Sequence, residues 1–215
     1  MTMNESYALF TIRPIFSIDD PSWPAWRDIY LDSFPLDEQL VEAHFLNLFD
    51  KIREGKKVLE QVLVMEVPSS RNTHGNADVV AIAFIEEVPS LGIFLLWYLA
   101  TVADKRNQGY GSYFYHWILD KVKDDQLNLL LFEVEIPETA GESALASRRI
   151  DWYRRLGAKL IQGIKYMQYV NPDIPPKEMF LMTHQLSSAD ATAVFTNAKA
   201  YFGEQLEQHG ELVLS

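Results

Sequence analysis

The most constraining feature of this sequence is an apolar, strand-like run that leads through a glycine-containing loop into a long amphipathic helix. The run covers residues 93–102, and the loop reads Arg-x-x-Gly-x-Gly, from Arg106 through Gly109 to Gly111. Residues 109–125 then repeat apolar side chains at helical spacing. A strand that continues into a helix is typical of chains that mix both elements, so the sequence predicts an α/β (α+β) protein.

The loop has the chemistry of a phosphate-binding site. Backbone N–H groups at a helix start have no intrahelical acceptor and lie at the positive end of the helix dipole. Glycines let phosphate oxygens approach that backbone, and Lys105 and Arg106 add positive charge. The spacing differs from the P-loop and from the three-glycine dinucleotide fingerprint. On its own, the hexapeptide fits an ordinary strand-to-helix turn equally well.

The remaining segments predict further strands and helices in a mixed order. Apolar periodicity and turn residues predict helices at residues 23–33, 35–55, 109–125, 146–156 and 190–208, and strands at residues 7–15, 58–67, 79–88, 93–102, 127–136, 159–169 and 179–186. Residues 187–190, Ser-Ser-Ala-Asp, resemble a capping box for the last helix. We expect a mixed, mostly antiparallel sheet of about seven strands flanked by helices. Residues 1–186 would form one domain, and residues 187–215 a C-terminal helical extension packed on it.

Composition excludes several kinds of site. The 215-residue chain has no cysteine, which removes disulfides, thiolate metal sites and cysteine nucleophiles. Thirty Asp and Glu residues against 19 Lys and Arg residues give a formal net charge of −11. This charge disfavours nucleic acid and anionic membranes as partners and favours a cationic partner. The five histidines have no metal-ligand spacing, so we expect no metal.

Two observations concern location. Residues 1–10 lack a basic region followed by an apolar run, which argues against a signal peptide. The longest apolar stretch, residues 91–102, is shorter than the roughly 20 residues that a membrane-spanning helix needs. We expect a soluble, cytoplasmic protein.

The glycine loop, taken with a second motif, resembles the GNAT superfamily of N-acetyltransferases. In that superfamily an Arg/Gln-x-x-Gly-x-Gly/Ala loop follows the fourth strand. Residues 148–158, Arg-Arg-Ile-Asp-Trp-Tyr-Arg-Arg-Leu-Gly-Ala, resemble its second signature, a helix that carries a tyrosine and ends in Leu-Gly. The element order over residues 7–186 is also similar. More narrowly, residues 33–38 and 132–137 resemble an uncharacterised bacterial branch, which supplies no substrate.

The resemblance implies an enzyme that transfers an acetyl group from acetyl-CoA, its co-substrate, to a primary amine of a small, cationic molecule. Acetyl-CoA would lie where strand 93–102 separates from strand 127–136. The backbone of Leu99, Ala100 and Thr101 would hold the pantetheine arm. The pyrophosphate would bind mainly to main-chain N–H groups at Arg106, Asn107, Gln108, Gly109, Tyr110, Gly111 and Ser112.

Tyr153 matches the superfamily tyrosine that protonates the departing thiolate as general acid. A phenol of pKa about 10 is a plausible acid for a thiolate whose thiol has a pKa near 8.5. The alternative is that Tyr153 only packs, because Ile150, Trp152 and Leu156 flank it on an amphipathic helix.

The acceptor amine also needs to lose a proton. For a lysine-like amine of pKa about 10.4, the neutral form at pH 7 costs about 4.6 kcal/mol. Glu133 and Glu135 share one face of a central strand and are the catalytic candidates, acting directly, through water, or as anchors for a cationic substrate. Alternatively, that face meets solvent, or the two carboxylates pair with Arg148 or Arg149.

Three positions depart from the superfamily pattern. Ala103 replaces the usual proline, Ala146 a frequent asparagine, and Ala158 a frequent aromatic residue. The asparagine often contacts pantetheine, so its loss implies weaker CoA binding or a substitute such as Ser143 or Ser147.

Other functions and assemblies remain open. The chain could be a non-catalytic acyl-CoA sensor, or an acetyltransferase that acts on a protein amine. The acceptor site would be formed by residues 23–53 and by the loops 68–76 and 137–145, which do not define the acceptor. A homodimer could form through an exposed edge strand at residues 179–186, unless the C-terminal helix covers that edge.

Overall fold

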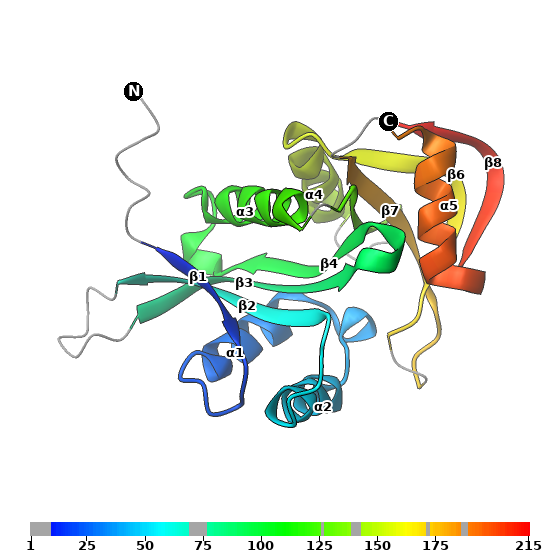
Figure 1. Ribbon diagram of the computed structural model, residues 1–215. Coiled ribbons are helices and arrows are strands. Elements are labelled where there is room, and N and C mark those ends of the chain that lie inside the picture. The colour runs from blue at the N-terminus through cyan, green and yellow to red at the C-terminus, as the bar shows by residue number, and fades with distance from the viewer. Residues whose placement is uncertain (1–9, 69–76, 126, 139–142, 171–172, 186–188) are drawn as a thin grey trace. The chain divides into compact units, whose positions relative to one another are not determined.

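The computed structural model describes residues 10–68, 77–125, 127–138, 143–170, 173–185 and 189–215 (Figure 1). The helices are α1 (Trp23–Ser33), α2 (Glu42–Arg53), α3 (Tyr110–Asp124), α4 (Ser143–Arg155) and α5 (Ala191–Phe202). The strands are β1 (Thr11–Ile15), β2 (Glu60–Pro68), β3 (Ala77–Val88), β4 (Ile93–Thr101), β5 (Leu129–Glu135), β6 (Lys159–Gln168), β7 (Lys177–Gln185) and β8 (Leu206–Leu214). Short 3-10 helices are η1 (Leu36–Glu38), η2 (Pro89–Leu91), η3 (Ala103–Lys105) and η4 (Gly203–Gln205). None of the helices described is long and apolar enough to cross a membrane.

The strands form one mixed sheet in the order β1-β2-β3-β4-β5-β7-β6-β8. β4 and β5 are parallel, with Ile93 opposite Leu129 and Leu96 opposite Phe132. The pairs β1–β2, β5–β7, β6–β7 and β6–β8 are antiparallel. The expected mixed, mostly antiparallel architecture is confirmed. The sheet has eight strands rather than about seven, because the end of the described chain adds β8.

The chain divides into two compact units. The first holds the described residues up to Ile85 together with Tyr98–Trp117, and the second holds Glu86–Trp97 and Ile118–Ser215. The first unit therefore contains the glycine loop, and the second contains β5 and α4.

The core of the first unit is a cluster of aromatic rings from α1, α2 and β3. Trp26 is fully buried, and its ring stacks on Trp23 at 5.4 Å and on Tyr30 at 5.1 Å. Phe45 of α2 meets Trp26 edge-on at 5.0 Å and Phe84 of β3 at 5.2 Å. Each such pair stabilises the fold by about 0.5–1.5 kcal/mol, in addition to the stabilisation that comes from burying its apolar surface. The cluster fixes α1 and α2 on one face of the first strands (Figure 1).

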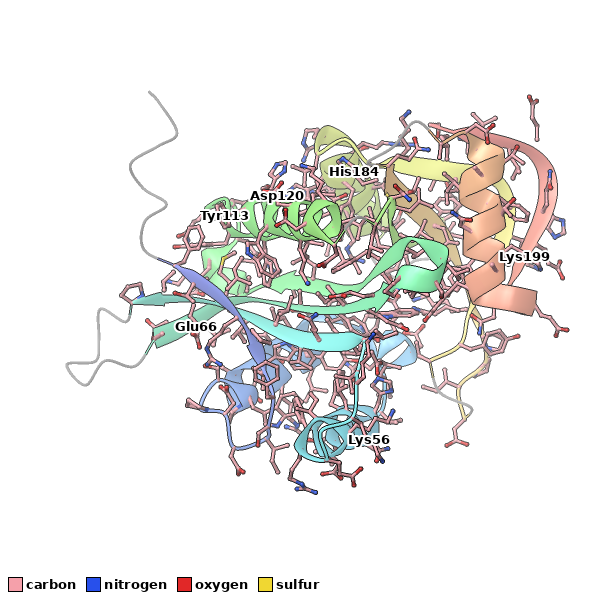
Figure 2. All side chains as sticks on the ribbon, in the orientation of Figure 1. Lys56, Glu66, Tyr113, Asp120, His184 and Lys199 are labelled. Atoms are coloured by element: carbon pink, nitrogen blue, oxygen red, sulfur yellow. The ribbon has the colours of Figure 1, made fainter. Side chains whose placement is uncertain are left out.

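An ionic cluster joins β1 to β2 and to the segment before α1. Arg13 donates to both carboxylate oxygens of Glu66, at 2.9 and 2.8 Å, and to both oxygens of Asp20, at 2.6 and 3.0 Å. Ser22 Oγ donates to Glu66 at 2.5 Å. Figure 2 labels Glu66 on β2. The hydrogen bond from Arg13 holds the pKa of Asp20 below its ordinary value.

In the second unit, apolar residues of β5, β6 and β7 pack under α5. Leu131, Leu181 and Tyr166 share this core with Val194 and Phe202 of α5. Neighbouring residues of a strand point to opposite faces, so the residue after Leu131 leaves this core. That residue is Phe132, whose ring lies 4.3 Å from the ring of Tyr153 on α4. α4 therefore packs on the face of β5 to which Phe132 points. α4 and α5 thus cover opposite faces of β5.

The second, fourth and last helices differ from their expected bounds, and α4 begins at Ser143 rather than at residue 146. The second helix begins at Glu42 rather than near residue 35, since residues 36–38 form η1 and side chains bind the backbone after it. Leu40 N donates to Tyr30 Oη at 2.7 Å, and Gln39 Nε2 donates to the Phe34 carbonyl at 2.6 Å. These bonds replace helical ones. The cap of α5 is Asp190 itself, whose carboxylate accepts from Ala193 N at 2.8 Å. Ser187 lies outside the described residues.

The last helix ends at Phe202, so the expectation of helix as far as residue 208 is wrong. Gly203 takes a φ of +56°, and residues 206–214 form β8 against β6. The expectation of an edge strand at residues 179–186 is also wrong, because β7 lies between β5 and β6. The described sheet ends instead in β1 and β8. This removes the reason given for dimerisation through β7.

Candidate functional site

The glycine loop lies in the first unit, between the end of β4 and the start of α3. Val102 N donates to the Val80 carbonyl at 3.0 Å, which fixes the point where the strand ends. Asn107 has a φ of +61° and Gly109 a φ of +89°. Both angles lie in the region that favours glycine and that asparagine tolerates. These two positions turn the chain from η3 into α3.

The loop also holds itself in place through side chains. Arg106 Nε donates to the Thr101 carbonyl at 3.2 Å, and Gln108 Nε2 donates to the Asp104 carbonyl at 3.0 Å. The hydrogen bond from Tyr113 N to the Gly109 carbonyl, 2.9 Å long, belongs to the first turn of α3. Figure 2 labels Tyr113 on this turn. N–H groups that precede this bond point toward the helix start, where an anion is favoured.

The predicted cofactor residues of the first unit differ in exposure. Arg106, Asn107, Gln108 and Gly109 are exposed, whereas Leu99, Ala100, Thr101, Tyr110, Gly111 and Ser112 are partly buried. Lys105 Nζ lies 3.7 Å from a carboxylate oxygen of Asp104, which balances part of the local positive charge. Arg106 therefore supplies the more available cation of the loop.

Tyr153 lies in the second unit and is 7% exposed. Its ring contacts those of Phe132 at 4.3 Å and Trp152 at 4.7 Å. Burial raises the pKa of Tyr153 to about 12, and the charge of Arg149, one helical turn earlier, acts in the opposite direction. The phenol thus carries its proton at neutral pH, while its ring packs as the alternative hypothesis expects.

Glu135 is engaged in ion pairs. Its Oε2 lies 3.0 Å from Arg149 Nη1, and its Oε1 lies 3.5 Å from Lys177 Nζ. The pairing of a strand carboxylate with Arg149 was one of the alternatives from the sequence. Arg149 contacts Glu135, and its charge partly offsets the rise that burial causes in the pKa of Tyr153.

Glu133 has a different environment from Glu135. Tyr166 Oη donates to its Oε1, and Gln168 Nε2 donates to its Oε2. Because Phe132 faces Tyr153, Glu133 projects to the opposite face of β5, beside its antiparallel neighbour Leu181. The phenol and the two carboxylates therefore approach β5 from opposite faces.

The positions near Ala146 offer only partial substitutes for an asparagine. Ala146 is buried, Ser143 is exposed and Ser147 is partly buried.

Parts of both predicted acceptor loops, residues 69–76 and 139–142, lie outside the described residues. Tyr166 and Gln168 were not anticipated as partners of Glu133, since they lie 33 and 35 residues away and no motif marks them.

Among the described histidines, His44 Nε2 lies 2.6 Å from Glu60, and His116 is exposed on α3. Across the part of the chain that the structure describes, no group of three or more His, Asp or Glu residues could hold a metal ion. His74 lies outside the described residues.

The glycine loop opens α3 beside a mixed sheet whose parallel pair is β4–β5. No family model matches the sequence, and no curated protein matches it. Solved structures do match. A Bacteroides thetaiotaomicron protein described as a GNAT-family acetyltransferase has a TM-score of 0.66 at 19% identity, over 91% of this chain and 98% of its own.

Two further structures support the same fold. A GNAT-family acetyltransferase from Elizabethkingia anophelis, solved with acetyl-CoA bound, has a TM-score of 0.53 at 13% identity, over 83% of this chain and 99% of its own. A ribosomal-protein-alanine N-acetyltransferase from Brucella melitensis has a TM-score of 0.52 at 20% identity, over 82% of this chain and 99% of its own. The chain has the fold of the GNAT acetyltransferases, which confirms the resemblance at the level of fold.

Proposed function

We propose that this protein transfers an acetyl group from acetyl-CoA to a primary amine. The observation that carries the proposal is the Arg-x-x-Gly-x-Gly loop, with its left-handed turns at Asn107 and Gly109, in front of α3 of a GNAT fold. A structural neighbour with this fold was solved with acetyl-CoA bound. The loop would bind the anionic part of such a ligand.

Acetyl-CoA binding is proposed to use the main chain more than side chains. The N–H groups from Arg106 to Ser112 would take the pyrophosphate at the positive end of the α3 dipole. The half-buried backbone of Leu99, Ala100 and Thr101 would pair with the amide groups of the pantetheine arm as an added strand does.

Tyr153 is proposed as the acid for the departing thiolate. A phenol of pKa about 12 gives its proton to a thiolate only uphill, by about 3.5 pKa units for a thiol near 8.5. We therefore expect Tyr153 to stabilise the sulfur first as a hydrogen-bond donor and to transfer its proton late. The charge of Arg149 favours this transfer because it lowers the pKa of Tyr153.

The carboxylates are proposed to serve the acceptor amine. Its nitrogen attacks the thioester carbonyl, the C–N bond forms and the C–S bond breaks. The attacking nitrogen, neutral after one proton has passed to water, loses its second proton toward Glu133 or Glu135, directly or through water. The sulfur gains a proton from Tyr153, and the tyrosinate recovers one from water. A net charge of −11 and a carboxylate at the acceptor both favour a cationic amine as substrate.

The test is release of free thiol from acetyl-CoA across a panel of small amines and of peptides with free amino groups. We expect Tyr153→Phe to lower turnover by about 10²- to 10⁴-fold, the usual contribution of a general acid, with CoA affinity unchanged. Tyr169→Phe is the matched control, because Tyr169 is 57% exposed in the same unit. If Tyr153→Phe turned over at the wild-type rate, Tyr153 would not be the general acid and would only pack.

Two alternatives have their own outcomes in this assay. A protein amine as acceptor is favoured by the Brucella melitensis neighbour, whose name refers to a ribosomal protein. Turnover confined to the peptides would support it. A non-catalytic acyl-CoA sensor is favoured by Ala146, which replaces a frequent pantetheine ligand. Binding of CoA by calorimetry without turnover on any amine would support the sensor.

A further inference from the structure

The polar cluster of Glu133, Tyr166 and Gln168 spans three strands of the second unit. Glu133 comes from β5, and the other two come from β6, on the far side of β7. Tyr166 is 2% exposed and Gln168 is 7% exposed. A half-buried carboxylate that accepts hydrogen bonds from two buried donors is held in a fixed orientation.

The amide of Gln168 has one orientation that fits this cluster. Its Nε2 must face Glu133, because a carbonyl oxygen in that place would meet a carboxylate oxygen with no proton between them. The other end of the amide, Oε1, is then buried and has no hydrogen-bond partner among the residues that the structure describes. Buried carbonyl oxygens are nearly always paired, so this one calls for a donor.

The two groups together select the chemistry of the missing partner. An ionised carboxylate and an amide carbonyl oxygen both accept hydrogen bonds, so their common ligand must offer at least two N–H or O–H donors. Lys177, the cation opposite Gln168 on β7, is engaged with Glu135 at 3.5 Å. A primary ammonium group carries the required donors and the charge that Glu133 favours.

We propose that Glu133 and Gln168 Oε1 form the ammonium-binding subsite for the acceptor amine, with Tyr166 and Gln168 Nε2 holding the carboxylate in place. The subsite deepens the proposed function, on which it rests, by making Glu133 rather than Glu135 the carboxylate that meets the amine. Its substrate class is a primary amine, recognised through N–H groups as well as charge.

The probes are n-pentylammonium and n-pentyltrimethylammonium, which carry the same charge but differ in N–H donors. Binding is measured by protein-observed NMR titration without acetyl-CoA. The wild-type protein should bind the primary ammonium at least tenfold more tightly than the quaternary one. Gln168→Met should bring the two affinities within about threefold, because it removes the carbonyl acceptor at similar volume. Glu133→Gln should weaken the binding of both ammonium probes.

Tyr166→Phe is the second variant, since it keeps the ring against Phe202, whose centroid lies 4.7 Å away, and removes only the hydroxyl. It should weaken binding of the primary ammonium, because Glu133 loses a donor that orients it, while the protein stays folded. Gln208→Met, on the exposed β8, is the control and should match the wild type. A wild-type protein without preference for the primary ammonium, or a Gln168→Met variant that keeps it, overturns the proposal.

The same variants separate this subsite from the proposed function. If thiol release occurs and Gln168→Met leaves the amine KM unchanged, the transferase stands and the subsite falls. If Gln168-dependent ammonium binding is found without turnover, the subsite stands and the transferase falls. A rise in amine KM of tenfold or more with an unchanged acetyl-CoA KM supports both.

Discussion

At the scale of single residues, the backbone conformation of the glycine loop matters more than its side chains. Asn107 and Gly109 adopt positive φ angles, which a β-branched residue strongly resists. Gly111 lies in the first turn of α3 with no such requirement. Gly109 therefore allows the turn, whereas the proposed purpose of Gly111 is to let phosphate approach the main chain.

We expect Gly111→Val to weaken CoA binding at least tenfold, or about 1.4 kcal/mol, because its side chain blocks the approach of phosphate to the main chain. Gly109→Val should weaken it further, since valine also resists a φ of +89°. Isothermal calorimetry with CoA measures both. His116→Ala, which alters only an exposed side chain further along α3, is the control. Unchanged affinity in both valine variants would show that the pyrophosphate binds elsewhere.

Whether a site residue could be predicted from the sequence depends on whether a contiguous motif marks it. The loop and Tyr153 are marked by contiguous motifs, so both could be predicted as candidates. The ion pair of Glu135 with Arg149 could be anticipated only as an alternative, 14 residues apart. The contacts of Glu133 with Tyr166 and Gln168 cross β7, and no periodicity encodes such a distant pairing.

At the scale of elements, β8 depends on an unusual approach between two strands. A Cβ added to Gly163 would lie 2.1 Å from the carbonyl oxygen of Glu211, and Gly163 has a φ of +81°. Pairing of β6 with β8 shifts register between Gln162 and Ile164, at this glycine. The bulge at Gly163 lets the two backbones come together.

Gly163→Ala should destabilise the second unit by about 2–6 kcal/mol, since strain at positive φ and overpacking each cost about 1–3 kcal/mol. Urea unfolding gives the free energy, and amide hydrogen exchange should show that β8 loses protection first. Gly55→Ala is the matched control, because Gly55 has a φ of +70° and nothing within 4 Å of its Cβ. Equal losses in the two variants would mean that the contact with β8 contributes nothing.

The sequence predicted most elements to within a few residues but missed β8. Apolar residues continue at helical spacing from α5 to Leu206, so periodicity alone extends the helix past its true end. Gly203 was the available stop signal. β8 itself is mostly exposed and polar, with a burial pattern that lacks the alternation of a half-buried strand. An edge strand of this kind is defined by its partner β6 rather than by its own residues.

At the scale of the whole molecule, the acidic charge is distributed into local clusters with distinct roles. Asp20 and Glu66 surround Arg13 in the first unit, and Glu133 and Glu135 gather donors and cations in the second. The net charge of −11 indicated a cationic partner but not where it binds. The mixed fold class followed from element order, whereas the clusters required the three-dimensional arrangement.

The Arg13 cluster makes stability depend on pH. Because the folded pKa of Asp20 is depressed, its stabilisation is present above the unfolded value of about 3.9 and is lost as pH falls through the lower folded pKa. Arg13→Met should cost about 2–3 kcal/mol at pH 7, below the 3–5 kcal/mol of a fully buried pair, because Arg13 is 31% exposed. At pH 3 the loss should be smaller.

Urea unfolding of wild type and Arg13→Met at pH 7 and pH 3 measures this difference. Arg53→Met is the control, because the side chains of Arg53 and its partner Asp50 are 77% and 55% exposed, and such pairs contribute little. A loss at pH 3 as large as that at pH 7 would contradict a role for the carboxylate charges.

The close approach at Gly163 also has a meaning for other sequences. No side chain beyond hydrogen fits between β6 and the backbone of Glu211, so a chain that adds a strand in this register must keep glycine there. We therefore expect any protein of this fold that pairs a further strand with β6 in the same register to carry glycine at the position of Gly163.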